Sequence, residues 1–320
     1  MKSSNIGGQA VMEGIMMRHK DKYSIAVRRP DNEIELKVED YKCVFGNAKF
    51  LKYPLIRGVV SFVDSLVVGT KCLMYSAEIA GDEEDEEDKQ KNAALSEEEL
   101  AAKKAKEDKQ FKWLLYVTVA VSIVVSVAAF MLLPYALASL CRKVGASEFA
   151  VTIVEAFVKL ALFMGYMLLI SRMKDIQRTF MYHGAEHKCI NCVEHGLPLT
   201  VENVMASSRQ HKRCGTSFLF FVMIVSIIFC FFIVTESPVL RVVLRIALFP
   251  LIAGVSYEII RLAGNSDNSF VNLLSKPGMW VQNMTTKEPD DAINEARIRA
   301  VEEVFDWKEY LRENFGADVR

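Results

Sequence analysis

The stretch from Trp113 to Cys141 decides the fold class, and it reads WLLYVTVAVSIVVSVAAFMLLPYALASLC. It contains 29 residues and no charge. A bilayer core about 30 Å thick needs about 20 apolar residues in helical form. An amphipathic helix on a soluble core keeps one polar face, and this run has none. The run therefore predicts a transmembrane helix that Pro134 kinks or ends near its far interface.

Three further apolar runs extend this prediction to a polytopic protein. The four predicted spans cover about residues 113–140, 149–171, 215–235 and 239–260. The second span contains Glu155 and Lys159, which are four residues apart and can pair on one helical face. The fourth contains Arg241 and Arg245, which can extend their charged ends to a membrane interface. We therefore expect a mainly α-helical membrane protein.

The segment 51–80 carries a different pattern. Its charged residues alternate in sign and lie seven positions apart: Arg57, Asp64, Lys71 and Glu78. Seven residues is close to two helical turns, so these side chains form one charged stripe on an otherwise apolar helix. This pattern predicts an interfacial or bundle-packed amphipathic helix rather than a lipid-facing span.

Composition and charge exclude several classes of protein. The chain has 320 residues, a formal net charge of −1 and 7 cysteines. A near-neutral chain lacks the basic face of a dedicated nucleic-acid binder, and the cysteines are too few for a disulfide scaffold. Membrane lipid is the expected partner, nucleic acid is not, and a homo-oligomer stays open.

The distribution of Lys and Arg predicts the orientation in the cell membrane. Basic residues concentrate just before the first span and between the second and third spans. Such short basic segments stay on the cytoplasmic side. Residues 1–20 lack the apolar core of a signal peptide. We expect a multi-pass protein of the cell membrane with both termini cytoplasmic.

The remaining segments predict small cytosolic parts. Residues 1–50 read as a cap with a β-hairpin, because 23–29 and 33–39 alternate on either side of a turn at Pro30. Residues 81–95 form an acidic linker. The helical membrane domain spans 96–262 and includes a cytosolic loop, 172–214. Residues 263–320 form an amphipathic cytosolic tail with a helix after Pro289.

The loop 172–214 contains the residues that point to chemistry. It reads HGAEHKCINC at 183–192 and RQHKRC at 209–214. His183 and His187 share one face of a helix and can chelate a divalent metal, with zinc the expected ion. With Glu186 they form H-x-x-E-H, the pattern of inverted zincins, in which the carboxylate is the general base. Glu186 is therefore the candidate catalytic residue.

Two imidazoles are too few ligands for a metal. His211 and Cys214 lie three residues apart and are the expected third and fourth ligands. Arg209 and Arg213 add positive charge suited to a carboxylate or phosphate group of a substrate. Gly184 weakens the required helix by about 1 kcal/mol relative to alanine.

Two alternative interpretations of the loop stay open. Cys189, Cys192, His211 and Cys214 have the spacing of a closed structural zinc knuckle, which would brace the loop and do no chemistry. In the other interpretation these side chains bind no metal.

Several motifs resemble the YqhQ-like family of bacterial integral membrane proteins. They are GGQAVMEGIMMR at 7–18, YHGAEHK at 182–188, RCGTSF at 213–218, SYEII at 256–260 and TKEPDD at 286–291. The family is described as a predicted metal-dependent enzyme of unknown function. The resemblance implies that the candidate ligands, Glu186 and the turn from Gln9 to Glu13 belong together. The family pattern continues after Arg18 with Gly-Pro, where this chain has His19-Lys20, and it does not include Cys189.

Gln9 and Glu13 have an expected role beside the metal. Imidazole ligands need acceptors that orient their second ring nitrogen, and either side chain would serve if the cap packs on the loop.

These features lead to one main hypothesis about function. We expect a membrane-embedded metal-dependent hydrolase that acts at the cytoplasmic interface on a lipid-linked or peptide substrate. The alternative is a non-enzymatic membrane scaffold or a transporter-like protein with a structural zinc site. Transport through the polar groups of the spans is a third hypothesis, although no inverted repeat is evident in the sequence.

Overall fold

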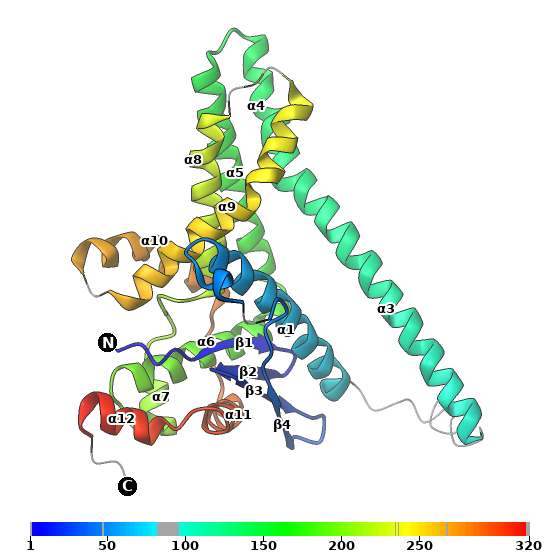
Figure 1. The fold of residues 1–320 in the computed structure, drawn as a ribbon, viewed down its shortest axis with the longest axis vertical. Coiled ribbons are helices and arrows are strands. Elements are labelled where there is room, and N and C mark those ends of the chain that lie inside the picture. The colour runs from blue at the N-terminus through cyan, green and yellow to red at the C-terminus, as the bar shows by residue number, and fades with distance from the viewer. Residues whose placement is uncertain are drawn as a thin grey trace. The chain divides into compact units, whose positions relative to one another are not determined.

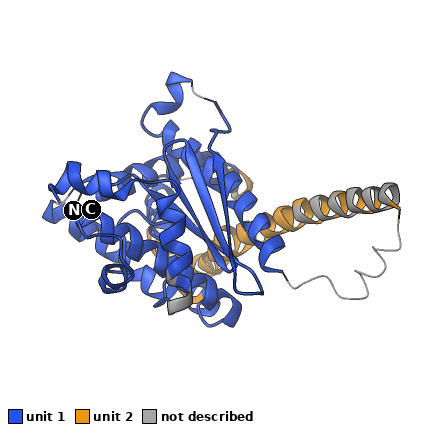
Figure 2. Cartoon of the chain, turned by 90° about the horizontal axis from the view of Figure 1, so that it is seen from below, with its two compact units in different colours: residues 1–81, 166–236, 243–320 blue, residues 82–165, 237–242 orange. Residues whose placement is uncertain are grey.

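The computed structural model describes residues 2–46, 48–81, 96–233, 235, 237–266 and 268–317 (Figure 1). The predicted acidic linker lies outside these residues except for Gly81. The chain divides into two compact units, residues 1–81, 166–236 and 243–320, and residues 82–165 and 237–242 (Figure 2). The residues of the candidate site all belong to the first unit.

The N-terminal cap is a four-stranded antiparallel sheet in the order β1-β2-β3-β4. The strands are β1 (Gly7–Val11), β2 (Gly14–His19), β3 (Lys22–Arg28) and β4 (Ile34–Asp40). The predicted hairpin is present as β3 and β4, and two further strands precede it. Two-residue connections with positive φ at Glu13 and Lys20 join the first three strands, as the twist of antiparallel hairpins requires.

One face of the sheet packs on α1 (Ile56–Ala80). Val11, Met16 and Ile25 bury their side chains there around Cys72. Polar contacts tie the same half of the helix to the strands. Tyr75 donates a hydrogen bond of 2.6 Å to Glu35, and Lys71 pairs with Glu39. The sheet therefore covers the C-terminal half of α1.

The opposite face of the sheet packs on α6 (Lys174–Glu194) and α11 (Asp291–Glu302) (Figure 1). Ile15 and Met17 from β2 meet Tyr182, Ala185 and Ile293 in the main hydrophobic core. The short helix α12 (Trp307–Phe315) adds Leu311 to this core. The sheet is thus the middle layer between α1 and the pair α6 and α11.

Within the described part of the chain, five helices are long and apolar enough to cross a membrane. They cover Ile56–Ala80, Tyr116–Lys143, Glu148–Ile170, Gly215–Phe232 and Val239–Asn265. The last four correspond to the four predicted spans, and they lie in α3 (Glu97–Val127) with α4 (Leu133–Lys143), α5 (Glu148–Ile170), α8 (Gly215–Phe232) and α9 (Pro238–Asn265). The first of the five is α1, for which the charged stripe predicted an interfacial or bundle-packed position.

Pro134 does not end the helix in which it lies. A π-helical turn, η2 (Ala128–Leu132), joins α3 to α4, and Pro134 occupies the first turn of α4. A π turn changes the local hydrogen-bond pattern and so accommodates a residue without an N–H. The helical path therefore continues to Lys143.

Half of the charged stripe of α1 faces protein, while Lys71 and Glu78 are exposed. Asp64 is buried and accepts hydrogen bonds from the Tyr41 hydroxyl at 2.6 Å and the Val44 amide at 2.9 Å. Arg57 pairs with Glu258 of α9, with 2.7 Å between Nε and Oε1. These partners hold the part of the stripe with Arg57 and Asp64 against protein.

The remaining helices are short or lie after the apolar segments. They are η1 (Lys49–Lys52), α7 (Val201–Ala206) and α10 (Ser269–Thr285). Gln282 of α10 is fully buried, and its side chain bonds to the main chain of His211 and to Ser217. This contact fixes α10 against the start of α8.

Candidate metal centre

Helix α6 positions the histidine pair as its spacing predicts. His183 and His187 are one turn apart, and their ring centroids lie 4.4 Å from each other. Gly184 lies between them because the chain passes very close there: an added Cβ would come 2.1 Å from the Lys287 carbonyl oxygen. The Lys287 amide also donates to the Phe180 carbonyl at 2.9 Å. Gly184 is unfavourable for helix formation, but its lack of a side chain allows the segment after α10 to pack on α6.

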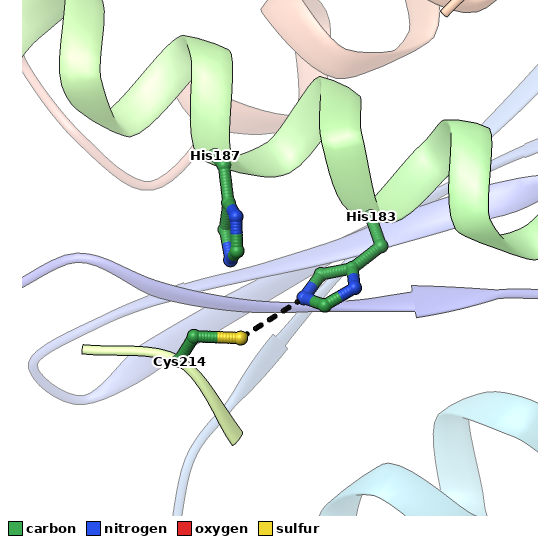
Figure 3. Close-up of side chains that lie close together, drawn as sticks. All are labelled: His183, His187 and Cys214. Atoms are coloured by element: carbon green, nitrogen blue, oxygen red, sulfur yellow. Dashed lines mark hydrogen bonds between the residues drawn. The ribbon is translucent and has the colours of Figure 1, made fainter. Parts of the chain in front are cut away.

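Three donor groups converge on one point (Figure 3). The ligand atoms of His183, His187 and Cys214 all lie within 4.8 Å of one another. His183 Nε2 lies 3.2 Å from Cys214 Sγ. His187 and Cys214 are buried and His183 is half-buried, so the group is largely shielded from water.

Main-chain carbonyls orient both imidazoles. His183 Nδ1 lies 2.8 Å from the Thr285 oxygen, and His187 Nδ1 lies 2.7 Å from the Arg209 oxygen. A carbonyl oxygen only accepts hydrogen bonds, so each Nδ1 carries a proton. In the neutral rings the lone pair is then on Nε2, the atom available as a ligand.

Cys214 lies in an environment that favours its thiolate. It is the N-cap of α8, and its Sγ accepts a hydrogen bond from the Thr216 amide at 3.4 Å. Burial alone raises the pKa of this thiol, but His183 and His187 outweigh burial and place its pKa well below the ordinary value. Burial lowers the pKa of His183, yet the adjacent Cys214 brings it to about 9.

Glu186 lies beside these donors under β1. Its carboxylate accepts a hydrogen bond from the Gly8 amide, and burial raises its pKa. A Cβ on Gly8 would come 2.8 Å from Glu186 Cγ, so only glycine lets the strand approach this closely. The predicted packing of the cap on the loop is therefore present.

The polar face of α6 holds the segment before Cys214. Lys188 Nζ donates to the carbonyls of Met205 at 2.7 Å and Ser207 at 3.1 Å. Asn191 donates to Ser208 at 2.7 Å and Gln210 at 2.8 Å. These bonds satisfy successive carbonyls of an irregular segment, and they place the Arg209 oxygen that orients His187.

His211 and Arg213 converge on Glu194 rather than on the donor group. His211 Nε2 lies 3.3 Å from Glu194 Oε2, and its ring centroid is 5.7 Å from that of His187. Arg213 pairs with the same buried carboxylate and with Ser3. The predicted ligand His211 is thus a neighbour of the donor group, and the predicted substrate residue Arg213 anchors the N-terminus.

The other residues predicted around the metal have different partners. The Gln9 amide group lies against α1, where it fills the position that a Cβ on Gly69 would need. Glu13 pairs with Arg178 at 2.9 Å. Neither side chain accepts an imidazole N–H, because main-chain carbonyls occupy that role. The Arg209 guanidinium is half-buried, with its Nε 4.0 Å from Glu288.

Cys189 and Cys192 lie in the hydrophobic core between α6 and α11. Burial raises the pKa of Cys189 to about 12 and that of Cys192 to about 11. The Cys192 thiol donates to the Pro198 carbonyl at 3.4 Å. Within the part of the chain that the structure describes, neither thiol belongs to the donor group, so the arrangement does not favour the zinc-knuckle alternative.

Several residues that build the site escaped prediction from the sequence. The carbonyls of Arg209 and Thr285 have no sequence signal, because every residue carries one. Glu194 and Gln282 are single polar residues in helical segments, and only their burial identifies them. The contact of Gly8 with Glu186 also has no sequence signal, because the two residues lie far apart along the chain.

Comparison with known proteins places the chain in a family. The family model described as "Protein of unknown function (DUF1385)" matches residues 53–307. The chain belongs to this family. A relative described as the uncharacterized protein YqhQ of Bacillus subtilis (strain 168) is 37% identical over 312 residues, which cover 93% of this chain and 92% of that protein. No solved structure matches the chain. Membership of DUF1385 therefore supplies a bacterial relative and no activity.

Proposed function

We propose that this protein is a membrane-bound, metal-dependent hydrolase that acts at the cytoplasmic face on a lipid-linked or peptide substrate. The observation that supports it best is the convergence of His183, His187 and Cys214, with both imidazoles oriented by main-chain carbonyls. Such orientation of the distal ring nitrogen accompanies imidazoles that bind metals.

The donor set fits a zinc ion. Two neutral imidazoles and one thiolate are ligands that Zn²⁺ prefers. Three protein donors are also one fewer than the four of a closed structural site, as is common in catalytic sites. A divalent metal held there would supply a Lewis acid that activates water for hydrolysis.

Glu186 is the group proposed to move a proton. It is buried beside both imidazoles, and its raised pKa brings proton uptake closer to neutral pH. The Gly8 amide fixes its carboxylate from the side of the sheet. We propose that Gly8 positions Glu186. Glu186 then exchanges a proton with the reacting group.

The apolar helices support a location at the membrane. Five of the described helices have the length and composition to cross a bilayer, and Lys and Arg are frequent in the loop 172–214 that carries most of the candidate site. The proposed orientation places the donor group on the cytoplasmic side, next to the ends of α8 and α9. A substrate anchored in lipid, or a peptide at the membrane surface, would reach it there.

The first test measures metal content in the purified full-length protein. We expect about one zinc per chain, and we expect Cys214→Ser and His183→Asn to weaken zinc affinity by about tenfold or more. Cys141→Ser and His195→Asn are matched controls outside the donor group and should retain the metal. Equal metal loss in the controls, or no bound metal in the parent protein, would contradict the proposal.

The second test separates a catalytic from a structural metal. Glu186→Gln keeps the shape of the side chain and removes its proton exchange. We expect it to retain zinc and lose more than about a hundredfold of the hydrolysis rate on a panel of fluorogenic peptides and phospholipid esters. A structural site in a scaffold or transporter predicts that Glu186→Gln changes no activity.

A second candidate function follows from the distance of 3.2 Å between His183 Nε2 and Cys214 Sγ. A thiolate beside an imidazolium at a helix N-terminus is also the arrangement of a nucleophilic cysteine. In that case metal-free protein would be active and Cys214 would react rapidly with iodoacetamide at pH 6. Protection of Cys214 by zinc together with loss of activity on chelation would support the hydrolase instead.

A further inference from the structure

A cavity lies within the first unit, formed by the connection from β4 to α1 and by α1 and α9. Its volume is about 370 Å³, and its lining includes Gly46, Lys52, Arg57, Ser61 and Arg261. None of these residues contributes to the candidate metal centre. The cavity is therefore a separate feature whose chemistry needs its own explanation.

Positive charge exceeds negative charge in this cavity. Glu258 pairs with Arg57 and lies 3.9 Å from Arg261, measured from its Oε2 to the guanidinium NH1. Among the described residues these are the ion pairs of the lining cations, so one carboxylate contacts two of the three positive groups and Lys52 has no ion pair. Two positive charges are left for a ligand, and the Ser61 hydroxyl adds a donor.

The frame around these cations is rigid. An added Cβ on Gly58 would come 3.0 Å from the Gly254 Cα, so the two helices approach closely at small residues. Arg57 makes a two-point contact with Glu258. Tyr41 and the Val44 amide bind Asp64 and so fix the connection that carries Gly46. Arg57 is thus held in position before any ligand binds, which lowers the entropic cost of binding.

Phosphate is the anion that suits this arrangement. Guanidinium groups match phosphate oxygens in a planar, two-point geometry, and lysine adds a point charge. The cavity would accommodate a phosphate group with part of its ester.

The surroundings indicate where that phosphate comes from. Exposed aromatic and aliphatic side chains flank the cavity on the same connection. Phe50 is 58% exposed, Tyr53 63% and Ile56 41%. A site for a soluble phosphate ester gives no reason to expose such groups, whereas aromatic side chains at a membrane surface lie among lipid headgroups.

We propose that this cavity binds the phosphate group of an anionic membrane phospholipid, with Lys52 and Arg261 as the principal contacts and Arg57 as a positioned third cation. In the proposed orientation, the end of α9 that carries Arg261 lies at the cytoplasmic membrane surface. The proposal goes beyond the hydrolase function and does not depend on it, because it involves different residues.

The test uses full-length protein in a neutral detergent. Fluorescent phosphatidylglycerol and fluorescent phosphatidylcholine are titrated in mixed micelles, and inorganic phosphate is the third probe. We expect the parent protein to prefer phosphatidylglycerol by about tenfold or more, because hydrogen bonds to charged groups are stronger than those between neutral groups. Inorganic phosphate at millimolar concentration should not displace the lipid.

Variants then assign the binding to the cavity. The double variant Lys52→Gln with Arg261→Gln should bind phosphatidylglycerol about tenfold more weakly. Lys308→Gln with Arg312→Gln removes the same two charges from the exposed face of α12 and should bind as the parent does. An unchanged thermal unfolding midpoint in both variants reports that they fold, and the single variant Arg261→Gln replaces the double variant if that one does not.

Three outcomes would overturn the proposal. The first is an equal affinity of the parent for the two lipids. The second is equal weakening in the α12 control, which would reveal attraction by net charge alone. The third is displacement by inorganic phosphate, which would make this a site for a soluble anion.

Discussion

At the scale of single residues, the site depends on positions where a side chain would not fit. Gly184 and Gly8 are the two that matter most. Gly184 faces the Lys287 carbonyl, and Gly8 faces the Glu186 side chain. Both contacts join segments that are distant in the sequence. The contact at Gly184 brings the Thr285 carbonyl beside His183, and the contact at Gly8 brings strand β1 over Glu186.

The substitution Gly184→Ala tests this close contact. Alanine favours a helix over glycine by about 1 kcal/mol, so propensity alone predicts stabilisation. The clash with the Lys287 oxygen outweighs it, and we expect a loss of about 1–3 kcal/mol in the free energy of unfolding and weaker zinc binding. Thermal unfolding and zinc titration measure both quantities.

Gly165→Ala is the matched control for this substitution. Gly165 also lies in a helix, α5, and an added Cβ there would meet nothing within 4 Å. It should be neutral or slightly stabilising. Similar behaviour of the two alanine variants would contradict the role assigned to Gly184.

The environment of Glu194 makes the free energy of unfolding depend on pH. Burial raises the pKa of this carboxyl, but His211, Arg213 and the Ser4 amide outweigh burial and bring it to about 2, from 4.5. A lowered pKa means that the stabilisation is complete above pH 4.5 and is lost as the pH falls toward 2. The difference corresponds to about 3 kcal/mol.

Denaturant unfolding at pH 7, 4.5 and 3 measures this effect. The parent protein should lose stability over this range, and Glu194→Gln should lose less because it has no proton to take up. Glu295→Gln, at an exposed carboxylate paired with Arg299, should follow the parent. Parallel loss in the parent and Glu194→Gln would exclude the assigned role of Glu194.

At the scale of elements, α10 fixes the segment that carries Cys214. The Gln282 side chain accepts from the His211 amide at 2.9 Å and donates to the His211 carbonyl at 2.8 Å and to Ser217 at 2.7 Å. The Thr285 carbonyl at the end of the same helix orients His183. Helix α10 thus contacts both the irregular segment before α8 and the imidazole of His183.

Gln282→Ala therefore affects the candidate metal centre without touching a ligand. It leaves three buried polar groups without partners, and we expect a loss of about 2–4 kcal/mol in stability together with faster zinc dissociation. Asn283→Ala changes the next residue, which is exposed and bonds only to the half-buried Gln210 among the described residues. It should behave as the parent does, and equal effects in the two variants would show that α10 has no special role.

At the scale of the whole molecule, the number of spans depends on α1. By length and composition it is one of five candidates. However, the sheet covers its C-terminal half, and Asp64 and Lys71 have protein partners. We therefore propose four spans, in α3 with α4, α5, α8 and α9. An even number places both termini on the same side.

Epitope mapping tests this topology. An epitope inserted after Gly145, in the turn between α4 and α5, should be detected on intact cells. An epitope at the C-terminus should be detected only after the membrane is permeabilised. Detection of both on intact cells, or of neither, would contradict four spans with cytoplasmic termini.

The sequence by itself determined the apolar helices, the β3–β4 hairpin and the pairing of His183 with His187. These features follow from local patterns, because absence of charge, alternation and one-turn spacing act over a few residues. The first hairpin escaped because its glycine-rich strand lacks clear alternation.

Only the tertiary structure decided which partners complete the site. It selected Cys214 for the donor group, assigned His211 and Arg213 to Glu194, and placed Gln9 and Glu13 against other elements. It also brought the Arg209 and Thr285 carbonyls to the imidazoles. These outcomes depend on how α6, α10 and the sheet pack together, and packing between distant segments leaves no periodic trace in a single sequence.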